Sequence, residues 1–164
     1  NYIKGLGPCA VSIALWEGEV PIFGVVFAID TGNLYWGGRH LGAFCNNKVI
    51  SVSEITDATL ASVCTGFPVR LDMNLKKTAD NFWDYISQFS KVRMLGCASI
   101  SLINVAMGAS EVYFENQIMI WDVAAGLAII EGAGGAISFD QGHGQHSLNV
   151  VASNNQIMVG SIQV

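Results

Sequence analysis

The strongest constraint on the fold is a change of hydrophobic pattern along the chain. Up to about residue 70, short apolar runs rich in β-branched and aromatic residues are separated by Gly, Asn and Asp, which is typical of strands and turns. From about residue 78, apolar residues recur at helical spacing between shorter strand-like runs. The 164-residue chain shows no internal repeat or low-complexity linker. It is predicted to fold as one layered α+β domain.

Four runs in the first part are predicted as strands: 10–16, 20–29, 34–36 and 59–65. Turn-forming sequences such as Glu17-Gly18-Glu19 separate the early runs at hairpin distance. We therefore expect an antiparallel sheet portion over about residues 1–70.

The second part, about residues 78–164, is predicted as an α/β portion. Its predicted helices are 80–89, 98–107, 122–133 and 154–162, and its predicted strands are 110–114, 136–139 and 148–152. Gly134-Gly135 follows the third of these helices, where a left-handed glycine commonly ends a helix.

Composition excludes several classes of protein. Charged residues make up 13% of the chain, roughly half the usual share, while 51% are hydrophobic. This excludes intrinsic disorder and indicates burial on more than one side. The net charge is −5 and the basic residues do not cluster beyond Lys76-Lys77, so no nucleic-acid partner is expected.

No membrane segment is expected either, because the longest uncharged apolar stretch, 94–109, is shorter than the roughly 20 residues that a spanning helix needs. The four cysteines form no CxxC pair, which favours free thiols in a reducing cytoplasm. His143 and His146 could share a metal ion if they lay on a helix, but the interleaved glycines favour an exposed loop.

Asp122 stands where a helix is predicted to begin. Its carboxylate would suit the N-cap position, where it accepts backbone N–H bonds near the positive end of the helix dipole. The small residues Ala124-Ala125-Gly126 follow, and they would let backbone or a ligand approach closely. The residues themselves leave open whether Asp122 is a cap or a functional carboxylate.

The segment Trp121-Asp122-Val123-Ala124-Ala125-Gly126, followed by Ala133-Gly134-Gly135, resembles the C-terminal signature of the inositol monophosphatase family. Three further segments resemble that family, namely 10–15, Gly42-Ala43-Phe44-Cys45-Asn46 and 93–99. The resemblance implies the later part of a layered αβαβα sandwich of the inositol monophosphatase and sugar phosphatase type.

The resemblance also implies roles for individual residues. Asp122 corresponds to a metal-binding carboxylate, and Glu115 to an acid that accepts a hydrogen bond from a sugar or inositol hydroxyl. Gly96, Cys97 and Ala98 correspond to backbone that lines the substrate pocket. Without the resemblance, Glu115 is equally well explained as a solvated carboxylate, and Gly96 is better explained as a helix-entry turn.

The activity implied is Mg²⁺-dependent hydrolysis of a small polyol or sugar phosphate monoester, such as an inositol-1-phosphate-like substrate, by a cytoplasmic homodimer. The sequence departs from the family pattern at Gly132, where the acid usual before Ala-Gly-Gly stands one position earlier as Glu131, and at Cys97 and Ser99.

The family's Asp-Pro-x-Asp-Gly-Thr metal motif is absent, and Asn1-Tyr2 resemble the residues that follow it. We therefore expect the 164-residue chain to be an incomplete phosphatase fold that is inactive by itself. The alternative is a non-catalytic assembly or scaffold module that keeps the fold.

Overall fold

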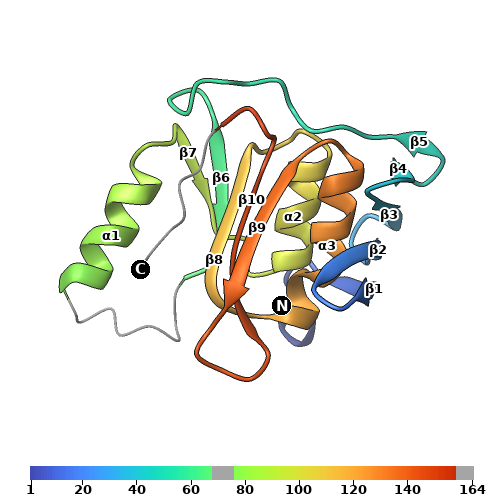
Figure 1. Ribbon diagram of the computed structural model, residues 1–164, viewed down its shortest axis with the longest axis horizontal. Coiled ribbons are helices and arrows are strands. Elements are labelled where there is room, and N and C mark those ends of the chain that lie inside the picture. Colours follow the sequence, from blue (N-terminus) through green and yellow to red (C-terminus); the bar gives the residue numbers. More distant parts are fainter. Residues whose placement is uncertain (68–75, 158–164) are drawn as a thin grey trace.

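The computed structural model describes residues 1–67 and 76–157. Across this part, the elements stack in layers (Figure 1): α1 (Lys76–Ile86), a five-stranded sheet, the pair α2 (Ala98–Ala106) and α3 (Ile120–Gly132), and a second five-stranded sheet. The helices α2 and α3 thus lie between two sheets. No helix of the described ranges is both long and apolar enough to cross a membrane.

The sheet nearest the N-terminus is an antiparallel meander that runs in chain order, as predicted. A short 3-10 turn, η1 (Tyr2–Lys4), precedes it. Its strands are β1 (Ala10–Glu17), β2 (Val20–Ala28), β3 (Asn33–Gly38), β4 (Gly42–Cys45) and β5 (Lys48–Val49).

The second sheet is mixed and has the order β7-β6-β8-β10-β9. Its strands are β6 (Ser62–Thr65), β7 (Lys91–Arg93), β8 (Val112–Met119), β9 (Ala136–Gln141) and β10 (Ser147–Ser153). β6 is parallel to both of its neighbours, and the other pairs are antiparallel. The expectation that residues up to about 70 share one antiparallel sheet is therefore corrected for β6. A short strand buried on both faces suits a parallel position between two helix layers.

The central helix α3 is hydrophobic nearly all round because it is covered on all sides. Residues 123–130 are all buried, and α3 contacts strands of both sheets as well as α2. Close approach depends on glycine: a side chain at Gly24 of β2 would overlap the backbone of Ala125, and one at Gly126 would overlap Leu102 of α2.

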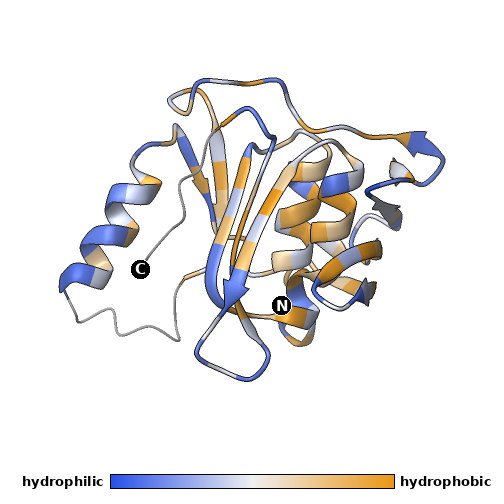
Figure 2. Cartoon of the chain, viewed as in Figure 1, coloured by the Kyte–Doolittle hydropathy of each residue, from blue (hydrophilic) through white to orange (hydrophobic). Residues whose placement is uncertain are grey.

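The helix α1 covers the opposite face of the mixed sheet. Its Phe82 and Ile86 are buried against a cluster that includes Val63 and Phe114. Figure 2 shows the amphipathic character of α1, with hydrophilic residues along its outer side.

Among the predicted boundaries that differ from the structure, three bear on the local structure of named residues. The helix α3 begins at Ile120 with Met119 as N-cap, so Asp122 lies in the first turn and is not the cap. β8 continues to Met119 because it pairs with β10 along its length, which places Glu115 in the middle of the strand rather than after its end.

The predicted closing helix 154–162 does not begin at Asn154: residues 154–157 are not helical, and the remainder lies outside the described residues. The Asn154 side-chain oxygen accepts hydrogen bonds from the backbone N–H groups of Gln156 and Ile157, each at 3.1 Å. An N-cap side chain makes the same hydrogen bonds, but Asn155 has a φ of +61°, so the backbone does not enter a helix there.

Candidate active site

A pocket of about 630 Å³ opens where both sheets meet the N-terminal ends of α2 and α3. It is lined by residues of β1, β6, β8, α2 and α3, and by the loops that follow β6 and precede α2. All five residues singled out from the sequence line this one pocket, namely Gly96, Cys97, Ala98, Glu115 and Asp122. Segments that are distant in the sequence are thus brought together around one polar cavity.

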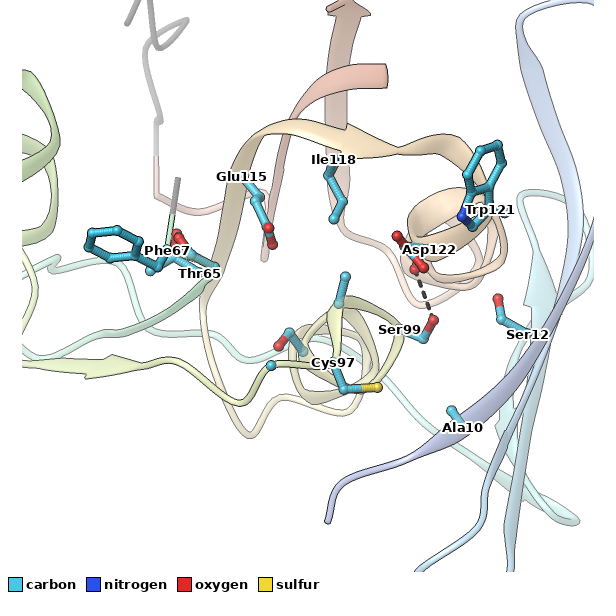
Figure 3. A pocket seen from close by; sticks show the side chains of 14 residues that line it. Ala10, Ser12, Thr65, Phe67, Cys97, Ser99, Glu115, Ile118, Trp121 and Asp122 are labelled. Carbon is cyan, nitrogen blue, oxygen red and sulfur yellow. Dashed lines mark hydrogen bonds between the residues drawn. The ribbon is translucent and has the colours of Figure 1, made fainter. Parts of the chain in front are cut away.

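Asp122 reaches the pocket from the first turn of α3. Figure 3 shows its carboxylate and that of Glu115 extending into the same space from α3 and β8. The backbone carbonyl of Asp122 accepts a hydrogen bond of 2.8 Å from the Ser99 hydroxyl at the start of α2, which ties the two helix ends together. A carboxylate in the first turn is also favourably placed with respect to the helix dipole.

The loop before α2 forms another wall of the pocket. Gly96 has a φ of +67°, a left-handed conformation that favours glycine. The Asn1 side-chain amide donates to the carbonyls of Leu95 and Gly96 at 3.2 and 3.4 Å, and so holds the loop in place. Cys97 is the N-cap of α2 and makes no side-chain capping bond. Backbone N–H groups at such a helix start are available to an anion.

The thiol of Cys97 is not activated. Burial is the main cause that raises its pKa, and the nearby Cys9 and Asp122 raise it further, whereas the backbone N–H of Ile100 opposes the shift. The thiol therefore remains protonated at neutral pH, which disfavours it as a nucleophile or as a metal ligand.

The donor chemistry of the pocket suits a hard cation only in part. Mg²⁺ takes oxygen ligands and is commonly held by one or two carboxylates together with waters and substrate phosphate. Asp122 can supply one such carboxylate. No group of three or more His, Cys, Asp and Glu side chains that could hold a metal comes together within residues 1–67 and 76–157.

His143 and His146 lie in the exposed loop between β9 and β10, as the glycine-rich sequence predicted. The ring of His146 is 5.9 Å from that of Trp121, centroid to centroid.

Sequence reasoning did not single out Ser12, Thr65, Gly66 and Trp121, which also line the pocket. Trp121 stands beside Asp122 in the recognised signature. Thr65 ends β6 and Gly66 follows it directly, a place where binding residues often occur. Nothing local in the sequence marks Ser12.

Comparison with known proteins shows which family the chain resembles. The sequence matches the inositol monophosphatase family over residues 1–162. It is 37% identical over 135 residues to the fructose-1,6-bisphosphatase/inositol-1-monophosphatase of Aquifex aeolicus, covering 82% of this chain and 51% of the relative. It is 30% identical over 165 residues to the Nus factor SuhB of Xylella fastidiosa, covering 100% of this chain and 60% of the relative.

Solved structures of proteins similar to this chain have the same fold. SuhB of Mycobacterium tuberculosis superposes with a TM-score of 0.81 at 26% identity, over 95% of this chain and 63% of that one. An inositol monophosphatase from Anabaena superposes with a TM-score of 0.76 at 29% identity, over 90% of this chain and 59% of that one. This chain thus spans between about half and two thirds of the length of these proteins. From the match over nearly its whole length and the shared fold, the chain belongs to the inositol monophosphatase family.

Proposed function

We propose that this chain contributes to the Mg²⁺-dependent hydrolysis of a small polyol or sugar phosphate monoester. The observation that carries the proposal is the convergence of Asp122, Glu115 and the 96–98 loop on one pocket. The family's relatives support it, because proteins similar to this chain bear the names of inositol and fructose phosphatases.

The five pocket residues that the sequence singled out each have a part in this proposal. The Asp122 carboxylate would hold magnesium, which when bound supplies charge neutralisation and activation of water. The Glu115 carboxylate would accept a hydrogen bond from a hydroxyl group of the substrate. The backbone of Gly96, Cys97 and Ala98 would line the substrate, with N–H groups at the start of α2 directed to its oxygens.

We further propose that residues 1–164 form one unit of a larger layered fold, and that other residues complete the metal site. The exposed apolar face of the first sheet supports this, as does the additional length of the relatives. Assembly as a homodimer and a cytoplasmic location are part of the same proposal. The four cysteines are all free, which fits a reducing compartment.

The test compares the 164-residue chain with a joined chain, in which the N-terminal segment of the Aquifex aeolicus relative precedes Asn1. Phosphate release from inositol 1-phosphate is measured against Mg²⁺ concentration. We expect release that requires Mg²⁺ from the joined chain and none from the 164-residue chain. Activity of the 164-residue chain above an identically prepared Asp122→Asn sample, or a folded but inactive joined chain, would contradict the proposal.

The second candidate is a non-catalytic assembly role. The observation that favours it is the name Nus factor carried by the Xylella fastidiosa relative, which this chain matches along its full length. A folded joined chain that releases no phosphate from any polyol or sugar phosphate would support this role over the first.

A further inference from the structure

Glu115 is held from two sides by residues that the family signature does not include. It stands on β8 two positions after Tyr113, so both side chains leave the same face of the strand. The Tyr113 hydroxyl donates a hydrogen bond of 2.8 Å to Glu115 Oε2. Tyr113 has no exposed surface, so this hydroxyl is directed by a packed ring that cannot swing away.

The second constraint comes from the neighbouring strand. β6 runs parallel to β8 and pairs Thr65 with Phe114, so the next residue, Gly66, lies beside Glu115. A β-carbon at Gly66 would overlap the Glu115 carboxylate itself. The Thr65 hydroxyl donates to the Gly66 carbonyl at 3.2 Å and helps to fix the backbone at this point. Glycine at position 66 is therefore what leaves room for the carboxylate.

We propose that Tyr113 and Gly66 are positioning residues that fix the Glu115 carboxylate in the pocket, and that they thereby determine how well the site accepts an alcohol bearing free hydroxyl groups. This inference rests on the proposed function, since Glu115 recognises a hydroxyl only if the substrate carries one. Tyr113 acts through Glu115 and does not itself line the pocket.

Two properties of Tyr113 and Glu115 suit the recognition of a substrate hydroxyl group. A carboxylate is an acceptor only, so a fixed carboxylate selects donors such as hydroxyl groups. Burial, followed by the adjacent Glu115 charge, raises the pKa of Tyr113 well above its ordinary value. The phenol therefore stays protonated and keeps its role as a donor throughout the neutral range.

The test uses the joined chain and two substrates: inositol 1-phosphate, which has free hydroxyls, and 4-nitrophenyl phosphate, which has none. Tyr113→Phe removes one oxygen and keeps the ring. We expect it to lower kcat/KM for inositol 1-phosphate about tenfold, mainly through KM, and to change that for 4-nitrophenyl phosphate by less than about twofold. Gly66→Ala should show the same selective loss. In a Glu115→Gln background, Tyr113→Phe should cause no further loss.

The matched control is Tyr85→Phe. The Tyr85 hydroxyl is buried and has no hydrogen-bond partner among the described residues. Its removal should therefore leave kcat/KM unchanged for both substrates. Equal losses on both substrates in Tyr113→Phe would overturn the inference.

A crystal structure of each variant separates this inference from the proposed function. We expect the Glu115 carboxylate to move in Tyr113→Phe and to stay in place in Tyr85→Phe. If the unsubstituted joined chain is folded but inactive, the proposed function fails, and the carboxylate positions still decide the positioning role. An unmoved carboxylate in Tyr113→Phe would refute that role.

Discussion

Asp122 has a different local role from the one its sequence context suggests. It lies in the first turn of α3, two residues beyond the start at Ile120, and Met119 occupies the cap position. Loss of its charge therefore removes a favourable interaction with the helix dipole and no capping bond of an N-cap side chain. Replacing one carboxylate oxygen of Asp122 by an amide group therefore distinguishes the two roles. A purely structural role predicts a small change in stability and no change in activity, whereas a metal-binding role predicts a large loss of activity.

For Asp122→Asn we expect a loss of roughly 0.3–1 kcal/mol in the free energy of unfolding without metal, the usual size of a helix-dipole interaction. In the joined chain we expect kcat to fall by orders of magnitude and the Mg²⁺ requirement to rise, because a neutral amide binds a hard cation less well than a carboxylate. Denaturant unfolding and phosphate release against Mg²⁺ measure the two effects.

The control for this substitution is Asp84→Asn on α1, because Asp84 is exposed and is not among the residues that line the pocket. It should leave the activity and its Mg²⁺ dependence unchanged. Near-normal activity of Asp122→Asn at low Mg²⁺ would show that this carboxylate is not a metal ligand.

At this scale the sequence predicts some site residues and not others. Asp122 and Glu115 are recognisable because they stand in or near a contiguous signature. Gly66 is not recognisable, because its relation to Glu115 depends on the pairing of β6 with β8, two strands about 50 residues apart. Register between distant strands is set by burial of whole faces and cannot be read from either segment alone.

Among the elements, α3 shows how a departure from the family pattern is accommodated. Glu131 forms an ion pair with Arg39 at the end of β3. At Gly132, a side chain would overlap the backbone of Gly38 and Gly42, so the helix end packs directly on the β3–β4 turn. Glu131, the acid one position earlier than usual, therefore pairs with Arg39, while Gly132 allows close contact between the helix and the sheet.

The helix α3 ends with a left-handed glycine, as the Gly134-Gly135 pair predicted, and its hydrogen bonds form a Schellman motif. Gly134 has a φ of +88°; its N–H donates to the Glu131 carbonyl at 3.2 Å, and the N–H of Gly135 donates to the Ile130 carbonyl at 2.9 Å. A β-carbon at Gly134 would meet nothing within 4 Å. Backbone strain is therefore the only penalty expected for a side chain at this position.

For Gly134→Ala we expect a loss of about 1–2 kcal/mol in the free energy of unfolding, because an L-residue resists the left-handed conformation. Gly134→Asn should lose less, since asparagine adopts this conformation more readily. Urea denaturation of the three chains compares them. An alanine variant as stable as the glycine form would show that α3 ends without the left-handed residue.

The positions of many helices and strands could be predicted from the sequence, but the pairing of strands between distant segments could not. Hydrophobic period and turn residues located β1, β2 and β3 and the helices α2 and α3 within a few residues, whereas β4, β5 and β7 were not predicted as strands. The same patterns could not show that β6 leaves the first sheet, because its four residues carry no sign of which neighbours they pair with. The Asn154 turn resembles a helix start in sequence because its side chain makes the hydrogen bonds of an N-cap, and the left-handed backbone of Asn155 cannot be read from the sequence.

For the whole molecule, the dominant feature is the outer face of the first sheet, which points away from α3. The β1–β2 register places Val11, Ile13 and Leu15 on one face opposite Phe27, Val25 and Phe23. Four of these six side chains are exposed and the other two are partly buried. Figure 2 shows β1 and β2 strongly coloured as hydrophobic. A contiguous apolar face of this kind is typical of an interaction surface, which is in line with the proposal that residues 1–164 form one unit of a larger layered fold.

Covering of this face has a consequence that a single substitution can reveal. Ile13 is 65% exposed at the centre of the β1 segment of the face. In the 164-residue chain, Ile13→Thr should change the free energy of unfolding by less than about 0.5 kcal/mol, as surface substitutions do. It should also reduce binding of the hydrophobic dye ANS. In the joined chain, the same substitution should cost about 2 kcal/mol, because a buried aliphatic group is lost and a hydroxyl is buried.

Leu60→Thr provides the matched control, because Leu60 is 70% exposed and lies before β6, outside the first sheet. It should change the stability of both chains by less than about 0.5 kcal/mol. Urea denaturation of the four variants gives the comparison. If Ile13→Thr costs the same in the joined chain as in the 164-residue chain, the added segment does not cover this face, and the proposal that residues 1–164 form one unit of a larger layered fold fails. A larger cost confined to Ile13 in the joined chain would assign the missing layer to the outer face of the first sheet.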